Sequence, residues 1–361
     1  MIKKLKDICQ IEKGQQIDTD LLDGSKPYKY INGGIRESGF YDEYNTKGTT
    51  ITVSEGGASC GYVNIIDEPF WCGCHCYKLT QIKVQPKYLY FNLKANQGKI
   101  MSLRTGSAMP NIRKSSFMEM QINVTNSNDE QRKIVTNLEK IEEVISKSKK
   151  ELLLLDEMIK SRFNEMFSKI IYSGDRETNF GSICDGIIGL TYKPDNISDE
   201  GTIVLRSGNI QNNSLQIIDD VVRVSNINIP DEKMVRDLDI LMCARNGSAR
   251  LVGKTCIIRN PTEQMTFGAF MTIIRTKYPY ILHHYMNSDF FRIQLKSTQT
   301  ASVNQITNGM LKEYSVFSPT DAEEKQFRSF VEQIDKLKFN VQKRIDYYQE
   351  LLNKKMDEYF N

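Results

Sequence analysis

The organisation of the chain follows from residues 129–167, which read DEQRKIVTNLEKIEEVISKSKKELLLLDEMIKSRFNEMF. Apolar side chains recur there at alternating spacings of four and three, the pattern of a coiled-coil seam. The seam positions are Ile134, Leu138, Ile141, Ile145, Leu152, Leu155, Ile159 and Met166, and Ser148 and Arg162 interrupt them. A helix of about 38 residues is roughly 57 Å long and needs a partner helix to be stable. The stretch therefore predicts one long helix that packs against another.

The partner lies in the same chain, because the pattern recurs 193 residues later. The second set of seam positions consists of Phe327, Val331, Ile334, Lys338, Ile345, Tyr348, Leu352 and Tyr359. Both copies begin with capping and acidic residues, Asp129-Glu130 in the first and Asp321 with Glu323 in the second, and such residues favour a helix N-terminus. The simplest arrangement is an antiparallel pair formed by the two predicted helices within the chain.

The segments that precede the two helices repeat as well. Ile8-Cys9 and Gly14 match Ile183-Cys184 and Gly189 at an offset of 175, and Pro86–Leu89 matches Pro279–Leu282 at an offset of 193. The second copy has therefore gained about 18 residues between these anchors, as insertions in loops do. Both segments contain short β-branched runs separated by Gly, Asn and Ser, which is typical of mixed α/β or mostly β domains.

We expect an α/β (α+β) protein built by tandem duplication. Its predicted parts are a globular domain over residues 1–128, a spacer helix over 129–167, a second globular domain over 168–322 and a second spacer helix over 323–361. An antiparallel coiled coil between two like domains would have pseudo-twofold symmetry.

Composition places the chain among ordinary folded proteins. Of its 361 residues, 26% are charged and 40% are hydrophobic, which excludes wholesale disorder and a collagen-like chain. The sequence has no run of 18 apolar residues and no apolar signal core near Met1, so we expect a cytoplasmic protein that does not enter a membrane. Its 8 cysteines are too sparse for a disulfide framework. Its net charge of +3 neither requires nor excludes a nucleic-acid partner.

Polar loops occur in matching places of the two domains, over residues 32–36, 54–59 and 104–114 in the first and 206–209, 245–250 and 296–305 in the second. Their Arg side chains can bind guanine, Asn and Gln can bind adenine, and Glu can accept a hydrogen bond from cytosine. A single loop of this composition is more often a plain surface turn, but the paired recurrence favours DNA binding. The candidate DNA-binding residues are Asn32, Arg36, Glu55, Ser59, Arg104, Asn111, Arg113, Lys114, Arg206, Asn209, Arg245, Asn246, Ser248, Arg250, Asn304 and Gln305.

These features together resemble the specificity (S) subunit of Type I restriction-modification systems, and the resemblance covers essentially the whole chain. It rests on the Ile8-Cys9 and Ile183-Cys184 starts, the loops around Gly33, Arg206–Ile210 and Asn246-Gly247, and the Met109–Ile112 stretch. The helix opening Glu130-Gln131-Arg132-Lys133-Ile134-Val135 resembles the family's motif closely, whereas its second copy, Glu323-Glu324-Lys325-Gln326-Phe327, has drifted.

The resemblance implies two target recognition domains that each read one half of a bipartite, interrupted sequence in double-stranded DNA. It also implies helices that act as a ruler, and a scaffold without catalysis of its own. On that scaffold two methyltransferase (modification) subunits, and then restriction subunits, would assemble. The apolar residues Leu153, Leu154 and Met158 lie off the seam and are candidates for methyltransferase docking, with contact to the adjacent domain as the alternative.

Motifs of an enzyme are weak or missing. Asn260-Pro261 lacks the second proline and the aromatic residue of an amino-methyltransferase motif, and Pro230–Lys233 is more typical of a charged turn than of a nuclease site. The run Cys72-Gly73-Cys74-His75-Cys76 lacks a second ligand pair for zinc and favours a buried strand with its cysteines on one face. His283-His284 aligns with Tyr90-Phe91, which favours aromatic packing. We therefore expect no catalytic residue, no metal and no cofactor.

Two other functions are alternatives at this point. A fused restriction-modification enzyme would need methyltransferase and nuclease motifs, and a coiled-coil adaptor would make no DNA contact. Substitution of Arg245 or Arg250 distinguishes an adaptor from a DNA reader, because it weakens DNA binding only in a reader.

Overall fold

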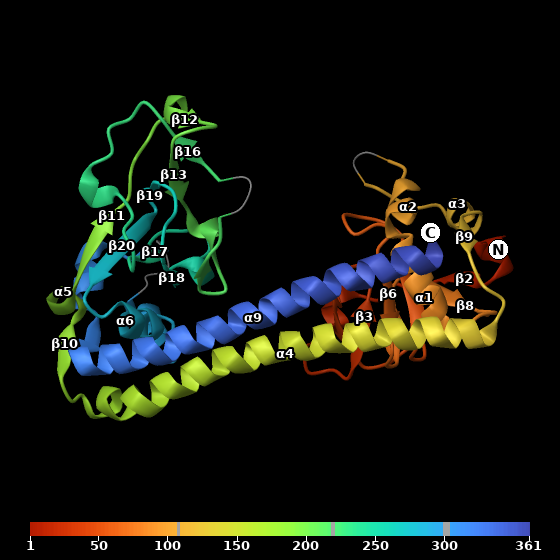
Figure 1. Ribbon diagram of the computed structural model, residues 1–361, viewed down its shortest axis with the longest axis horizontal. Helices are drawn as coiled ribbons and strands as arrows, with labels where there is room; N and C mark the ends of the chain where they lie inside the picture. Colours follow the sequence, from red (N-terminus) through yellow and green to blue (C-terminus); the bar gives the residue numbers. More distant parts are fainter. Residues whose placement is uncertain (107–108, 218–220, 299–303) are drawn as a thin grey trace. The chain divides into compact units, whose positions relative to one another are not determined.

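The computed structural model describes residues 1–106, 109–217, 221–298 and 304–361, which form two compact units. Unit 1 comprises Met1–Glu151 with Asn340–Asn361, and unit 2 comprises Leu152–Phe339. Two long helices, α4 (Asn128–Ser173) and α9 (Asp321–Phe360), each contribute one half to each unit (Figure 1). Each unit therefore combines a sheet domain with a pair of half-helices.

The first long helix extends past the predicted end at Phe167 to Ser173. The sequence contains no glycine or proline in between. Gly174 follows with a φ of 67°, and a glycine in this left-handed conformation is a common helix terminator. The helix therefore includes residues 168–173, which we predicted for the second domain.

In unit 1 the two half-helices run antiparallel and bury the predicted seam. The side-chain amide of Asn137 donates to the Tyr359 hydroxyl at 3.3 Å, and Nε of Arg344 donates to Oγ of Ser148 at 2.9 Å. Ser148 interrupts the apolar pattern, yet it is buried here because Arg344 satisfies it and also pairs with Glu151. The buried seam residues of this unit include Ile134, Leu138, Ile145, Val341, Ile345 and Leu352.

In unit 2 the half-helices are also antiparallel. The rings of Phe163 and Phe327 meet at 5.7 Å, and Lys338, the charged residue of the second seam, pairs with Asp156. The buried seam residues of this unit include Leu155, Ile159, Phe327, Val331 and Ile334. The predicted antiparallel coiled coil is confirmed within each unit.

Unit 1 is built on a central antiparallel sheet with the order β2-β8-β5-β6. A smaller sheet, β4-β3-β7, contains a parallel pair, β3 with β7, and a terminal ribbon joins β1 to β9. The strands are β1 (Ile2–Lys4), β2 (Gln10–Lys13), β3 (Tyr28–Ile31), β4 (Gly39–Tyr41), β5 (Thr50–Ser54), β6 (Val63–Ile66), β7 (Phe70–Cys72), β8 (Cys76–Thr80) and β9 (Gln121–Asn123). The short helices are α1 (Pro86–Ala95), α2 (Gln97–Ser102) and α3 (Lys114–Met118).

Unit 2 repeats this topology and extends it. Its main sheet begins β11-β20-β17-β18 and adds β15 and β14, its second sheet, β12-β16-β13-β19, contains the parallel pair β13 with β19, and β10 pairs with β21. The strands are β10 (Glu177–Asn179), β11 (Cys184–Ile188), β12 (Ile197–Ser198), β13 (Thr202–Leu205), β14 (Ile210–Gln211), β15 (Ser214–Leu215), β16 (Arg223–Val224), β17 (Ile240–Cys243), β18 (Thr255–Ile257), β19 (Met265–Phe267), β20 (Met271–Thr276) and β21 (Ser315–Phe317). The helices are α5 (Phe180–Ile183), α6 (Pro279–Met286), α7 (Asp289–Thr298) and α8 (Asn308–Glu313).

Two glycines that the repeat aligned, Gly14 and Gly189, make the same close approach in the two units. A Cβ at Gly14 would lie 2.2 Å from the carbonyl oxygen of Gly73, and a Cβ at Gly189 would lie 2.1 Å from that of Gly268. No real side chain tolerates such distances, so both positions require glycine. The duplication inferred from the sequence is thus reproduced in strand order and in packing.

No helix among the described residues combines the length and the apolar character that a membrane crossing requires.

In each unit a side chain near the start of a long helix is bonded to the N-terminal region of a domain helix. In unit 1, Oε1 of Gln131 accepts from the backbone N–H of Gln85 at 2.9 Å, just before α1. In unit 2, the two carboxylate oxygens of Glu324 accept from the N–H groups of Tyr280 and Ile281, each at 3.0 Å. Gln131 and Glu324 occupy equivalent positions at the offset of 193, and both are buried.

We predict that Glu324→Ala destabilises unit 2 by about 2 kcal/mol, because two buried backbone donors at the start of α6 lose their acceptor. Glu324→Gln, which keeps one acceptor oxygen, should cost about half as much. Urea unfolding measures the change, and hydrogen exchange of the amides of residues 279–286 localises it. Glu350→Ala, an exposed change on the same helix, is the matched control. Equal stability of the two alanine variants would contradict the bonding role of Glu324.

Of the aligned histidines of unit 2, His284 packs among aromatic rings, as the alignment predicted, whereas His283 packs against the His284 ring and polar side chains. The ring of His284 lies 5.0 Å from that of Phe327 and 6.5 Å from that of Phe163. Nδ1 of His283 lies 3.3 Å from the hydroxyl of Thr255. Burial lowers the pKa of His284 to about 4 and lowers the pKa of His283 as well.

We therefore predict that unit 2 loses stability as the pH falls from about 6.5 to about 4. In this window an unfolded imidazole binds a proton and the folded one does not, so acid favours the unfolded state by up to about 1.4 kcal/mol per pH unit for each histidine. His284→Phe, which introduces the residue found at the aligned position 91, should flatten this slope. The free energy of urea unfolding at pH 7, 6 and 5 measures it, and identical slopes for the two proteins would refute the assignment to His284.

Candidate nucleic-acid interface

The strand pairing of unit 1 brings its predicted loops to one edge of the domain. In the parallel pair of β3 and β7, Ile31 lies beside Cys72, so the loop after β3 starts next to the turn that leads into β8. In the antiparallel pair of β5 and β8, Ser54 lies opposite Cys76, so the loop after β5 starts at the same place. The topology alone thus places residues 32–36 and 55–60 side by side.

Hydrogen bonds then join all three predicted loops of unit 1. Oγ of Ser59 donates to the carbonyl oxygen of Gly33 at 2.6 Å, which links the second loop to the first. The N–H of Ile112 donates to the carbonyl oxygen of Glu55 at 2.9 Å, and the N–H of Gly57 donates to that of Pro110 at 3.0 Å. The third loop is therefore tied to the second along its backbone.

The loops of unit 2 converge in the same way. Leu205 pairs with Phe267 and Cys243 pairs with Met271, which is the register of unit 1 repeated. The N–H of Ile306 donates to the carbonyl oxygen of Ala244 at 2.7 Å, in the manner of Ile112 and Glu55.

Two asparagines complete the junction of the loops in unit 2. Nδ2 of Asn246 donates to Oγ of Ser207 at 3.3 Å, and Nδ2 of Asn304 donates to the carbonyl oxygen of Gly247 at 3.1 Å. The backbone of Gln305 forms an isolated antiparallel β-bridge with that of Arg245. Residues 107–108 and 299–303, which belong to the predicted third loops, lie outside the described residues.

The predicted site residues fall into two groups, and the first group presents exposed side chains. It consists of Arg36, Asn111, Arg113 and Lys114 in unit 1 and Arg206, Arg245, Ser248 and Arg250 in unit 2. Each unit thus has three exposed basic side chains among its predicted site residues. Exposed Arg and Lys on loops that a rigid sheet positions are suited to contacts with phosphates and base edges.

The second group holds the loops together from within. Asn209 is buried, where its Oδ1 accepts from the N–H of Arg206 and its Nδ2 donates to the carbonyl oxygen of Gln216. Oδ1 of Asn32 accepts from the N–H of His75 at 3.0 Å. Ser59, Asn246, Asn304 and Gln305 make the inter-loop contacts described above. Polar side-chain atoms of Ser59, Asn246 and Asn304, and the backbone of Gln305, are engaged in the protein, so these residues shape the loops that carry the exposed cations.

Glu55 and Arg104 also turn inward. The Glu55 carboxylate, which is 8% exposed as a residue, accepts from the Tyr77 hydroxyl at 2.9 Å and pairs with Lys13 at 2.6 Å. Burial and this bond to Glu55 raise the pKa of Tyr77 above its ordinary value. Nε of Arg104 donates to the carbonyl oxygen of Cys60 at 2.8 Å. In this structure neither side chain is available for an external partner.

Sequence reasoning missed two aromatic residues that support the exposed arginines of unit 2. The guanidinium of Arg245 lies over the ring of Phe270 at 5.3 Å, and Phe270 is itself 59% exposed. Arg206 donates to the Tyr192 hydroxyl and lies over its ring at 5.9 Å. Each ring orients a planar guanidinium that would otherwise be free to rotate. The signal available in the sequence was an aromatic residue in the turn between two predicted strands.

The cysteine run of unit 1 is not the single strand that we expected. β7 ends at Cys72, β8 begins at Cys76, and Gly73–His75 form the turn between them, because the N–H of Gly73 is bonded to Ile31 of the neighbouring strand. Cys72 and Cys76 are buried, whereas Cys74 faces the side chain of Gln16. Within the part of the chain that the structure describes, no group of three or more His, Cys, Asp or Glu side chains could hold a metal ion.

Comparisons with known proteins agree with this geometry. Residues 1–155 match the family described as Type I restriction modification DNA specificity domain. The chain is 35% identical over 139 residues to a type I specificity subunit of Mycoplasma genitalium, covering 38% of this chain and 36% of that protein. It is 36% identical over 135 residues to a type I specificity subunit of Mycoplasma pneumoniae, covering 37% and 36% respectively. The matched segments thus span little more than a third of these curated relatives.

A solved structure extends the likeness to the rest of the chain at the level of the fold. The crystal structure of the S subunit of a type I restriction-modification system from M. genitalium superposes with a TM-score of 0.60 at 20% identity, covering 100% of this chain and 96% of that one. The family match over residues 1–155, the two curated relatives and the fold of the M. genitalium S subunit together confirm the resemblance to the specificity subunits of Type I restriction-modification systems.

Proposed function

We propose that this chain is the non-catalytic subunit that selects the DNA sequence for a Type I restriction-modification complex. The segments that precede the two long helices, residues 1–127 and 174–320, are then two target recognition domains, and each reads one half of a bipartite, interrupted target in double-stranded DNA. The observation that carries the proposal is the convergence of three loops in each unit, with three of the predicted basic residues exposed in each cluster. A coiled-coil adaptor would not need such a cluster twice.

The two long helices would set the spacing between the half-sites and provide the scaffold for assembly. Support comes from their length and from their seam, which leaves other faces exposed. Leu153, Leu154 and Met158 are 67%, 56% and 48% exposed, so they do not pack on the adjacent domain. Apolar side chains in such a group favour a protein partner, and we assign that role to two methyltransferase subunits, through which restriction subunits would join.

The experiment that tests the proposal is methylation mapping. The chain is co-expressed with the methyltransferase subunit of a Type I system from the same source, genomic DNA and a methyl donor are supplied, and methylated adenines are located by single-molecule sequencing. One bipartite motif is the expected result. A complex that assembles and binds the methyl donor but methylates nothing would overturn the DNA-reading role and favour the adaptor.

We predict that the double substitution Arg245→Ala with Arg250→Ala weakens DNA binding by the assembled complex at least tenfold and alters one half of the motif only. Each well-placed arginine contact with a base edge contributes about 1–3 kcal/mol of discrimination. Binding isotherms at two salt concentrations measure the affinity and the loss of phosphate contacts.

Arg236→Ala is the control for this pair. Arg236 is exposed and basic, but it precedes β17, at the opposite end of the strand from the loop that carries Arg245. It should leave the affinity and the motif unchanged. The assignment of the loop fails if Arg236→Ala and the double variant behave alike.

A second prediction concerns assembly. Leu153→Ser with Leu154→Ser should reduce co-purification of the methyltransferase subunit at least tenfold, because two exposed leucines lose their apolar contact with it. Thermal unfolding should change little, since neither side chain is buried. Glu157→Ser, an exposed change on the next turn of the helix, is the control. Undiminished co-purification of the double variant would move the docking surface elsewhere.

A further inference from the structure

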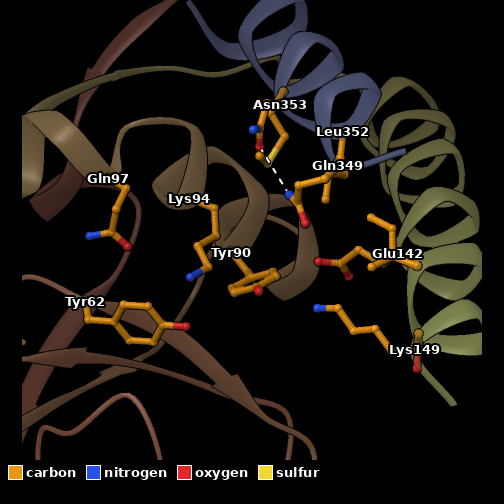
Figure 2. A pocket seen from close by; sticks show the side chains of 12 residues that line it. Tyr62, Tyr90, Lys94, Gln97, Glu142, Lys149, Gln349, Leu352 and Asn353 are labelled. Carbon is orange, nitrogen blue, oxygen red and sulfur yellow. Dashed lines mark hydrogen bonds between the residues drawn. The ribbon is translucent and has the colours of Figure 1, made fainter. Parts of the chain in front are cut away.

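Unit 1 contains a cavity of about 630 Å³ that is separate from the loop cluster. It lies where α1 and α2 of the sheet domain face the half-helices of α4 and α9. Its walls combine charged groups with aromatic and apolar ones, chiefly Tyr62, Tyr90, Lys94, Glu142, Lys149 and Leu352 (Figure 2). Cavities of this size that mix a few polar groups with aromatic walls are typical of small-molecule sites.

Three charged side chains line this cavity, two lysines and one glutamate. Among the residues that the structure describes, Lys94, Lys149 and Glu142 each lack an ion pair within 4.0 Å. The ammonium of Lys94 lies over the ring of Tyr62 at 4.1 Å and is 6.0 Å from the centre of the Tyr90 ring. Burial lowers the pKa of Lys94 and raises that of Glu142. Lys94 and Glu142 are partly buried, and partly buried charges without partners are costly. Lys149 is exposed at the mouth of the cavity, where it adds a second positive charge. The two partly buried charges point to a group that is supplied from outside.

The aligned residues of unit 2 make internal contacts where unit 1 has the cavity. At the offset of 193, Glu142 corresponds to Asp335, which pairs with Arg259, and Gln349 corresponds to Asp156, which pairs with Lys338. Each of these charges in unit 2 therefore has a partner within the chain.

Two further positions of the cavity, Lys94 and Tyr90, are also filled or bonded within unit 2. Lys94 corresponds to Asn287, whose Nδ2 donates to the Thr255 hydroxyl at 2.8 Å and to the carbonyl oxygen of His283 at 2.9 Å. Tyr90 corresponds to His283, which is buried. One copy of the duplicated frame has closed this place with internal pairs, whereas the other keeps it open with unpaired charges.

We propose that the cavity of unit 1 binds a small organic anion, a carboxylate or phosphate carried on an aromatic or apolar body. The anionic group lies between the ammonium groups of Lys94 and Lys149, which reach into the cavity from opposite walls (Figure 2). The body packs against the ring of Tyr90 and the apolar side chains of Leu352 and Met356. Two lysines outweigh the single carboxylate of Glu142, so the cavity selects negative charge.

The test is a calorimetric titration of the full chain without DNA, which makes its outcome independent of the proposed function. Phenyl phosphate is the probe, inorganic phosphate reports the anionic group alone, and benzylamine reverses the charge on the same body. Phenyl phosphate should bind with a submillimolar Kd, inorganic phosphate at least tenfold more weakly, and benzylamine not measurably.

Variants of the full chain assign the binding to the cavity. Lys94→Met should weaken phenyl phosphate binding at least tenfold, and Glu142→Gln should tighten it, because the opposing charge is removed. Lys150→Met, an exposed change one residue beyond Lys149, should alter the affinity less than twofold. Thermal unfolding of each variant verifies that it is folded.

Three results would overturn the proposal. They are unchanged binding in Lys94→Met, equal binding of benzylamine and phenyl phosphate, and a Kd for phenyl phosphate above about 10 mM. Equal affinities for inorganic phosphate and phenyl phosphate would overturn the part that assigns an aromatic body. If an acidic peptide binds to the cavity and neither phenyl phosphate nor inorganic phosphate does, the site takes a protein partner and the proposal of a small-molecule ligand is refuted.

Discussion

The architecture depends on a hydrogen-bonded contact between each long helix and the domain that it serves. A polar side chain in the first turns of the helix, Gln131 in α4 or Glu324 in α9, reaches into the protein and satisfies backbone donors around the start of α1 or α6. A second contact follows two turns later, where Glu139 pairs with Lys87 in unit 1 and Glu332 accepts from the Tyr280 hydroxyl in unit 2. Because each long helix makes both of these contacts, it cannot slide or rotate against its domain without leaving buried backbone donors unsatisfied.

The pairs that make this contact have changed chemistry between the copies while keeping their positions. The first position is an amide in unit 1 and a carboxylate in unit 2, and the second is a lysine that forms an ion pair in unit 1 and a tyrosine that donates a hydrogen bond in unit 2. Sequence drift is therefore tolerated when the geometry of donor and acceptor survives. The same rule explains the seam, where the polar Ser148 and Lys338 remain because Arg344 and Asp156 satisfy them.

The parts of the fold that could be predicted are those that depend on the periodicity of apolar residues and on steric constraints of the backbone. The helices followed from the spacing of Ile134, Leu138 and their successors, and the alignment of the two copies followed from Gly14 and Gly189, whose close approach admits no side chain. The orientation of single polar side chains could not be predicted in this way. Glu55 and Asn209 stand in loops of the right composition, but inward partners, Lys13 and Tyr77 for Glu55 and Gln216 for Asn209, decide where they point. These partners are distant in the sequence or are backbone groups, so the residues around Glu55 and Asn209 do not predict them.

The loop cluster shows how one frame can present two different surfaces, which is what the proposed function requires of a duplicated reader. The residue before the central strand β8 or β20 is His75 in unit 1 and Phe270 in unit 2, and its carbonyl oxygen holds the second loop in both, accepting from Glu55 N–H and from Ala244 and Arg245 N–H. The backbone contact is therefore common to the two units, while the side chain is an imidazole in one and an exposed ring under Arg245 in the other. Since the frame is held by main-chain bonds and buried side chains, the exposed positions can change without cost to the fold. Two copies that differ only at such positions would read two different half-sites with the same geometry, so recognition would be free to diverge while assembly stays constant.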